Sequence, residues 1–166
     1  MGKAEDEQAI RDLAAEYVDA VNRGDGLAMA AVYAPDGAIE IGGRRIQGMA
    51  RLQKAFRRLV EEQREIVFQM NHSGLVKVEG DRAAARWWFS ELKKPTGEPY
   101  EYSLGVYQDE LARLETGWRF VLRRPTGLML WRPREGEVAH FPRPAFLEVS
   151  GLSIPEDISG LPARAS

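Results

Sequence analysis

Residues 66–92, IVFQMNHSGLVKVEGDRAAARWWFSEL, contain two long β-type segments separated by Gly80 and Asp81. Aromatic and β-branched side chains are frequent in both segments, Ile66–Glu79 and Arg82–Leu92, and Gly-Asp is a favoured hairpin turn. Two more segments of this kind follow at Tyr100–Leu114 and Trp118–Leu130. The pattern predicts an antiparallel meander of four long strands.

The residues before the meander have helical periodicity. Apolar side chains recur every three to four residues over Glu5–Arg23, which predicts an amphipathic helix that ends at Gly24. A second short helix is expected at Leu27–Tyr33, and a third at Met49–Gln63. A turn at 35–37 and a small hairpin over residues 38–46 separate these two. Helices segregated from an antiparallel sheet define an α+β fold, and strands this long must curl and enclose a pocket.

Composition excludes several kinds of function. The net charge of −2 gives no basic field to attract nucleic acid or anionic lipid. The chain has no cysteine and two isolated histidines, so we expect no metal and no cofactor. The N-terminus lacks the apolar core of a signal peptide, and no window is apolar enough to span a membrane, which predicts a cytoplasmic protein.

The C-terminal part differs in composition from the rest. We predict one domain over residues 1–132 and a Pro-rich arm over residues 133–166, which covers the pocket mouth or a neighbouring subunit. His140 falls in this arm and is expected in a loop. Because the arm and the faces of the curled sheet carry apolar side chains, a homodimer or homotrimer is expected.

Particular strings in this order resemble the SnoaL-like group of the NTF2-like superfamily, over roughly Glu5 to Met129. The resemblance implies a cone-shaped α+β barrel, with three N-terminal helices packed on a curled, mainly antiparallel sheet around a pocket. The strings are Ile10-Arg11-Asp12-Leu13 with Tyr17, Asn22-Arg23-Gly24-Asp25, Gly48, His72, residues 80–86, Gly105 with Tyr107, Asp109 and Glu110, and Gly117-Trp118-Arg119.

Met70-Asn71-His72 followed by Arg86-Trp87-Trp88 is similar to one branch of that superfamily, which contains scytalone dehydratase, bile acid 7α-dehydratase and the lindane dehydrochlorinase. Enzymes of this branch eliminate water or HCl without a cofactor. They pair a His after the third helix with an Asp at the end of the first helix, and a Tyr upstream helps to polarise the substrate. The resemblance places His72 at the His and Tyr17 at the Tyr.

Asn22 stands where that branch has its Asp. A carboxylate orients an imidazole and stabilises its protonated form, whereas an amide orients it without supplying charge. We therefore expect His72 to move the proton, Tyr17 to donate a hydrogen bond to a substrate oxygen, and Asn22 to orient the imidazole or the substrate. Glu91 on the next strand is an alternative acid.

Alternation along Arg82–Leu92 separates two rows of side chains. The row of Ala83, Ala85, Trp87 and Phe89 is apolar and is expected to pack against another layer. The other row supplies the expected substrate wall, to which we add two aromatic residues of the following strands. The wall residues are Arg86, Trp88, Ser90, Tyr107 and Trp131. Alternatively, Arg86 faces water and Trp88 lies in an oligomer contact.

These residues lead to a functional hypothesis. The expected activity is that of a cofactor-independent, dehydratase-like lyase or isomerase, which uses general acid–base chemistry on a small hydrophobic cyclic molecule, such as a polyketide, terpenoid, steroid or aromatic compound. Two alternatives stay open. One is a cyclase or epoxide hydrolase on the same fold, and the other is a non-catalytic ligand-binding or interaction module.

Overall fold

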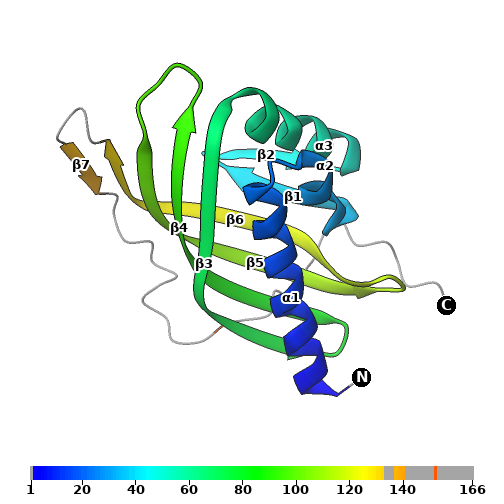
Figure 1. The fold of residues 1–166 in the computed structure, drawn as a ribbon. Coiled ribbons are helices and arrows are strands. Elements are labelled where there is room, and N and C mark those ends of the chain that lie inside the picture. The colour runs from blue at the N-terminus through cyan, green and yellow to red at the C-terminus, as the bar shows by residue number, and fades with distance from the viewer. Residues whose placement is uncertain (1, 133–136, 141–151, 153–166) are drawn as a thin grey trace.

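The computed structural model describes residues 2–132, 137–140 and 152. Three helices lie together on one side of a sheet, and the first two precede every strand while the third follows β2 (Figure 1). They are α1 (Lys3–Asn22), α2 (Gly26–Ala31) and α3 (Met49–Arg57), and α3 continues into the π-helical turn η1 (Arg58–Glu62). Gly24, with a φ of 67°, and the Asp25 cap on α2 form the corner between the first two helices.

The sheet is curled around these helices (Figure 1). Its order is β2-β1-β6-β5-β4-β3, with β7 paired to β6, and every pairing is antiparallel except β1 with β6. The fold is therefore the α+β cone expected from the sequence. The strands are β1 (Tyr33–Ile41), β2 (Arg44–Gln47), β3 (Arg64–Glu79), β4 (Arg82–Pro95), β5 (Glu101–Leu114), β6 (Gly117–Arg132) and β7 (Glu137–His140).

Three local expectations are wrong. The short second helix ends at Ala31, and Tyr33 begins β1 instead. The predicted turn at 35–37 lies inside β1, where the register shifts between Tyr33 and Ala38, because a bulge accommodates a proline that cannot donate to the ladder. His140 lies in β7, paired with Met129, and not in a loop. The rest of the predicted arm, except residues 137–139 and 152, lies outside the described residues.

The core fills the space between α1 and the inner face of the sheet. Tyr17 of α1 contacts the rings of Tyr33, Phe56, Tyr107 and Phe120 edge-on, with centroids 6.2–6.4 Å apart. Each ring is at most 4% exposed. Burial of these aromatic surfaces holds the helix against the strands.

A charged contact fixes the N-terminal end of α1. The buried carboxylate of Asp6 accepts hydrogen bonds from Arg113 of β5 and from Trp118 Nε1 of β6 at 3.2 Å. The hydrogen bond from Arg113 lowers the pKa of Asp6. The N-terminal end of α1 is thus bound to β5 and β6.

The outer face of the sheet, opposite the helices, carries exposed apolar side chains that share one side by register. They are Phe68, Met70, Trp88, Leu92, Leu104 and Trp131, each 36–51% exposed. The expected homodimer or homotrimer stays a prediction. Among the described residues, no helix is long and apolar enough to cross a membrane.

Candidate functional site

The main pocket lies between the helices and the inner face of the sheet and has a volume of about 320 Å³. This volume is at the small end of the range for ligand sites. Its apolar wall includes Val21, Met29, Ile39, Leu59, Phe89 and Leu130. Its polar side chains are Tyr17, Arg64, Gln69, Glu91, Lys93, Ser103 and Tyr107.

A close backbone approach helps to shape the floor of the pocket. A Cβ on Gly105 of β5 would lie 2.4 Å from the ring of Phe89 on β4. The Phe89 ring therefore lies over Gly105 and stacks on Tyr107 with a centroid separation of 4.4 Å. A side chain at position 105 would clash with this ring and, at 2.7 Å, with the backbone oxygen of Thr126.

Gln69 binds the two pocket side chains best suited to proton transfer, Glu91 and Tyr107. Its Nε2 donates to Glu91 Oε2 at 3.0 Å and to Tyr107 Oη at 2.9 Å, which uses both amide hydrogens. Tyr107 accepts from Gln69, so its own O–H is left to donate. Gln69 Oε1 is buried and has no hydrogen-bond partner among the described residues. The three side chains thus present a carboxylate, a hydroxyl donor and an amide acceptor in one place.

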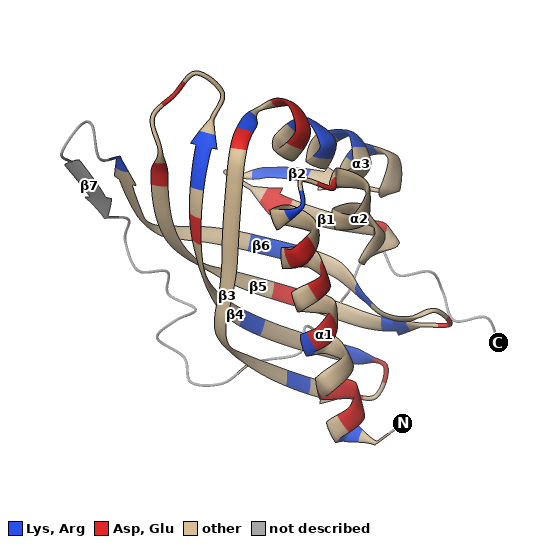
Figure 2. Cartoon of the chain, viewed as in Figure 1, with Lys and Arg blue, Asp and Glu red and all other residues tan. Residues whose placement is uncertain are grey.

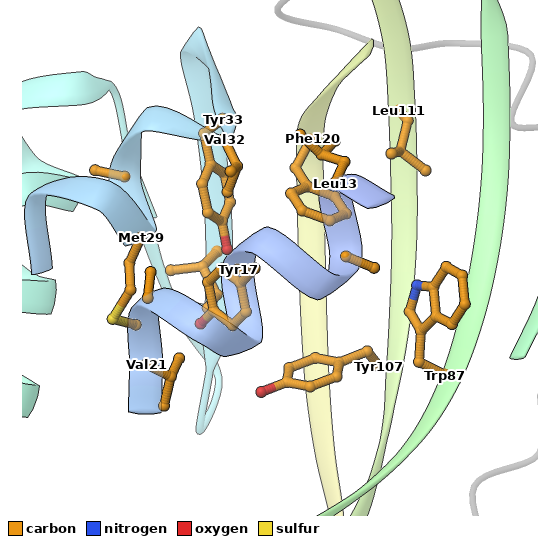
Figure 3. Packing of buried hydrophobic residues seen from close by; sticks show 14 of the residues in the cluster. Leu13, Tyr17, Val21, Met29, Val32, Tyr33, Trp87, Tyr107, Leu111 and Phe120 are labelled. Carbon is orange, nitrogen blue, oxygen red and sulfur yellow. The ribbon is translucent and has the colours of Figure 1, made fainter. Parts of the chain in front are cut away.

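A buried ion pair between Arg123 and Asp109 packs against the rings of Tyr17 and Tyr107. Arg123 and Asp109 form two hydrogen bonds of 2.8 Å, and both side chains are fully buried. The Arg123 guanidinium lies 4.3 Å from the ring centroids of both Tyr17 and Tyr107. Figure 3 shows Tyr17 between Tyr33 on one side and Tyr107 on the other.

Burial keeps these phenols protonated. It raises the pKa of Tyr17 above the usual value and raises the pKa of Tyr107 well above it. Arg123 opposes this rise in both cases but does not cancel it. Both hydroxyls are therefore hydrogen-bond donors and not bases, and Glu91 supplies the one carboxylate among the described lining residues.

Asn22 binds the backbone of the edge strand β3. Its Oδ1 accepts from Gln69 N at 2.6 Å, and its Nδ2 donates to Gln69 O at 2.8 Å. An amide can satisfy both groups, whereas a carboxylate could only accept. Asn22 therefore continues the ladder at an otherwise open edge. It does not line the pocket and does not contact an imidazole.

The expected approach of His72 to Asn22 is wrong. Gln69 is the β3 residue next to Asn22, and His72 is exposed on the outer face, where its Nε2 lies 2.9 Å from Ser90 Oγ. Residues three apart on a strand point to opposite sides. His72 therefore has a polar partner but no access to the pocket.

The expected substrate wall is also mostly on the wrong face. Arg86, Trp88, Ser90 and Trp131 do not line the pocket, whereas Tyr107 does. The apolar row of β4 faces the helices, and continuing it past Phe89 leads to Glu91 and Lys93. Trp88 and Trp131 belong to the exposed apolar outer face.

Gln69, Arg64 and Lys93 were not singled out from the sequence. Alternation beyond Phe89 would have added Lys93 and placed Glu91, already named as an alternative acid, on the inner row, where a carboxylate is unusual. Nothing in the local sequence marks Gln69, whose role depends on the pairing of β3 with β4. Among the described residues, no group of three or more His, Asp or Glu side chains forms a potential metal site.

A curled sheet that encloses a pocket with its helices is the α+β cone expected from the sequence. Residues 2–124 match the model of the SnoaL-like domain. The chain belongs to this family. A comparison of the sequence with functionally curated proteins gives no match.

Solved structures with this fold include enzymes. A putative scytalone dehydratase from Novosphingobium aromaticivorans is 17% identical with a TM-score of 0.70, over 76% of this chain and 86% of that one. A type 2 hexachlorocyclohexane dehydrochlorinase is 16% identical with a TM-score of 0.74, over 86% and 97%. A Mycobacterium tuberculosis protein of unknown function is 25% identical with a TM-score of 0.68, over 75% and 77%.

Proposed function

We propose that this protein is a cofactor-independent lyase or isomerase that acts on a small, largely apolar cyclic molecule carrying a carbonyl group. Polyketide, terpenoid, steroid and aromatic intermediates are of this kind. The proposal rests on one observation: Gln69 holds the Glu91 carboxylate and the Tyr107 hydroxyl side by side in an apolar pocket. A base next to a hydroxyl donor is the pair that proton transfer beside a carbonyl requires.

In the proposed reaction, Glu91 removes a proton from the carbon next to the carbonyl. The electrons of the C–H bond form a C=C bond, and the carbonyl oxygen becomes an enolate oxygen that accepts a hydrogen bond from Tyr107. An isomerase returns the proton from Glu91 to another carbon. In a lyase the C=O bond instead re-forms, a C=C bond replaces the bond to a β-substituent such as hydroxide, and the hydroxide takes the proton from Glu91 and leaves as water. Tyr17 of α1, whose ring centroid lies 6.2 Å from that of Tyr107, is a second donor that lines the pocket.

Exchange of α-protons with solvent tests this chemistry without the natural substrate. Nuclear magnetic resonance would follow deuterium incorporation into 2-tetralone, an apolar cyclic ketone, in D₂O. We expect the protein to accelerate exchange, Glu91→Gln to lower the protein-dependent rate by roughly 10²- to 10⁴-fold, and Tyr107→Phe to lower it by roughly 10²-fold.

Glu110→Gln is the matched control, because Glu110 pairs with Arg124 outside the pocket. It should exchange 2-tetralone at the wild-type rate. Each variant should keep a folded-state circular dichroism spectrum. Exchange no faster than in buffer, or full exchange by a folded Glu91→Gln variant, would contradict the proposed chemistry.

A second candidate function is ligand binding without catalysis. It is favoured by Asn22, a neutral amide where the dehydratase-like pattern has an Asp, because its side chain binds the backbone of Gln69 and no imidazole. In this case 2-tetralone would bind in the pocket and exchange its α-protons no faster than in buffer. The same experiment therefore separates the two functions.

A further inference from the structure

Two cations lie at the end of the pocket where β3 begins and β4 ends. Arg64 is the first residue of β3, and Lys93 lies near the end of β4. Figure 2 shows basic residues at these strand ends. Both side chains line the pocket and are largely buried, with 15% and 19% of their surface exposed. Glu91 is the single acidic residue among the described lining residues.

The acidic partners of these cations satisfy them poorly. Arg64 Nη1 and Lys93 Nζ both lie 3.4 Å from Glu91 Oε1. Lys93 lies 3.5 Å from Glu101, which is bound more closely by Arg132 at 2.7 Å. Charge-assisted hydrogen bonds are usually about 2.7–2.9 Å long. The two cations therefore share one carboxylate oxygen, and both N···O distances are longer than the optimum for a hydrogen bond.

The same two cations also border the solvent. A second, more open hollow is lined by Arg64 and Lys93 together with Leu59, Pro95, Glu62 and Glu101. Arg64 and Lys93 thus separate the apolar pocket from the open surface. A ligand with its apolar body inside the pocket would present any polar end to this pair.

We infer that the pocket selects an organic anion, an apolar ring system whose carboxylate binds Arg64 and Lys93 at the mouth. This inference rests on the proposed function, because it names the substrate class of the same pocket. Arginine and lysine have several donors each, so one ligand carboxylate can satisfy both. The ligand carboxylate replaces Glu91 as their partner, which leaves Glu91 held by Gln69 and directed at the apolar body.

Two probes of equal shape test the selection. Isothermal titration calorimetry would compare naphthalene-2-carboxylate with naphthalene-2-carboxamide. We expect the wild type to prefer the carboxylate by about tenfold or more, which corresponds to about 1.4 kcal/mol. Arg64→Met and Lys93→Met should each remove most of this preference and change carboxamide affinity by less than about twofold. Glu91→Gln should tighten carboxylate binding, because it removes the competing anion.

Lys94→Met is the matched control. Lys94 follows Lys93 on the same strand but pairs with Glu65 and lines neither hollow. Lys94 carries the same charge as Lys93. If the carboxylate preference came from the overall positive charge of this region, Lys93→Met and Lys94→Met would lower it equally, whereas a local binding site is lost only in Lys93→Met. The Lys94→Met variant should keep the carboxylate preference.

Equal affinity of the wild type for both probes, or equal losses in Lys93→Met and Lys94→Met, would overturn the inference and leave the proposed function intact. A carboxylate preference without Glu91-dependent exchange of 2-tetralone would support the inference and overturn the proposed function. If neither probe bound at millimolar concentration, the pocket would not be a ligand site and both proposals would fail.

Discussion

The two faces of the β5–β6 ribbon contain similar ion pairs in opposite environments. Asp109 and Arg123 pair on the inner face with both side chains fully buried, whereas Glu110 and Arg124 pair on the outer face with 14% and 37% exposed. The residues of one pair directly follow those of the other in the sequence. The comparison shows that alternation along a strand, and not residue type, decides whether a charge belongs to the core or to the surface.

The inner pair should be far more important for stability than the outer pair. Asp109→Asn keeps the side-chain shape but leaves the buried Arg123 charge uncompensated and weakens the hydrogen bond from Trp87 Nε1. We expect the free energy of unfolding to fall by about 3–5 kcal/mol. Urea denaturation followed by fluorescence measures this change.

Glu110→Gln serves as the outer-face counterpart, with an expected cost of about 0–1 kcal/mol because Arg124 is partly in water and keeps its second ion pair with Glu40. If Asp109→Asn and Glu110→Gln lowered the free energy of unfolding by similar amounts, the buried inner pair would not be more important for stability than the outer pair.

The edge of β3 offers a smaller test. Asn22→Asp retains an acceptor for Gln69 N but removes the donor to Gln69 O and brings a negative charge against that carbonyl. We expect a loss of about 1–3 kcal/mol in the free energy of unfolding. The matched control is Asp19→Asn on the same helix, whose exposed pair with Arg23 should matter little. An Asn22→Asp variant as stable as the wild type would show that the amide does not hold this edge.

The smallest effect is expected at the histidine of the outer face. His72→Ala removes a partner of Ser90 but no group that lines the pocket. The 2-tetralone exchange rate should stay within about twofold of the wild-type rate, in contrast to the loss expected at Glu91. A tenfold or larger loss in a folded His72→Ala variant would show that the outer face takes part in the chemistry.

Much of the fold could be predicted from local patterns. The spacing of Ile10, Leu13, Tyr17 and Val21 requires a helix with one apolar face, and all four residues are buried. The turns at Gly80-Asp81 and at 115–117 join the strands of the meander as predicted. These features depend on residues close together in the sequence, so a single sequence is enough to specify them.

The site could be predicted only in part. Tyr17 and Tyr107 line the pocket as expected, but His72 does not, and Gln69 was missed. Hydropathy could not choose the inner face of β3, because Phe68 and Met70 are more apolar than Gln69 and yet lie on the exposed outer face.

The sequence by itself determined which residues alternate on each strand and where the helices and turns fall. Only the tertiary structure decided which row faces the pocket, because α1 packs on one side of the sheet and covers it. The same packing pairs Gln69 with Glu91 across two strands and places Asn22 at the edge of β3. Residues distant in the sequence meet through these long-range contacts, which no local pattern encodes.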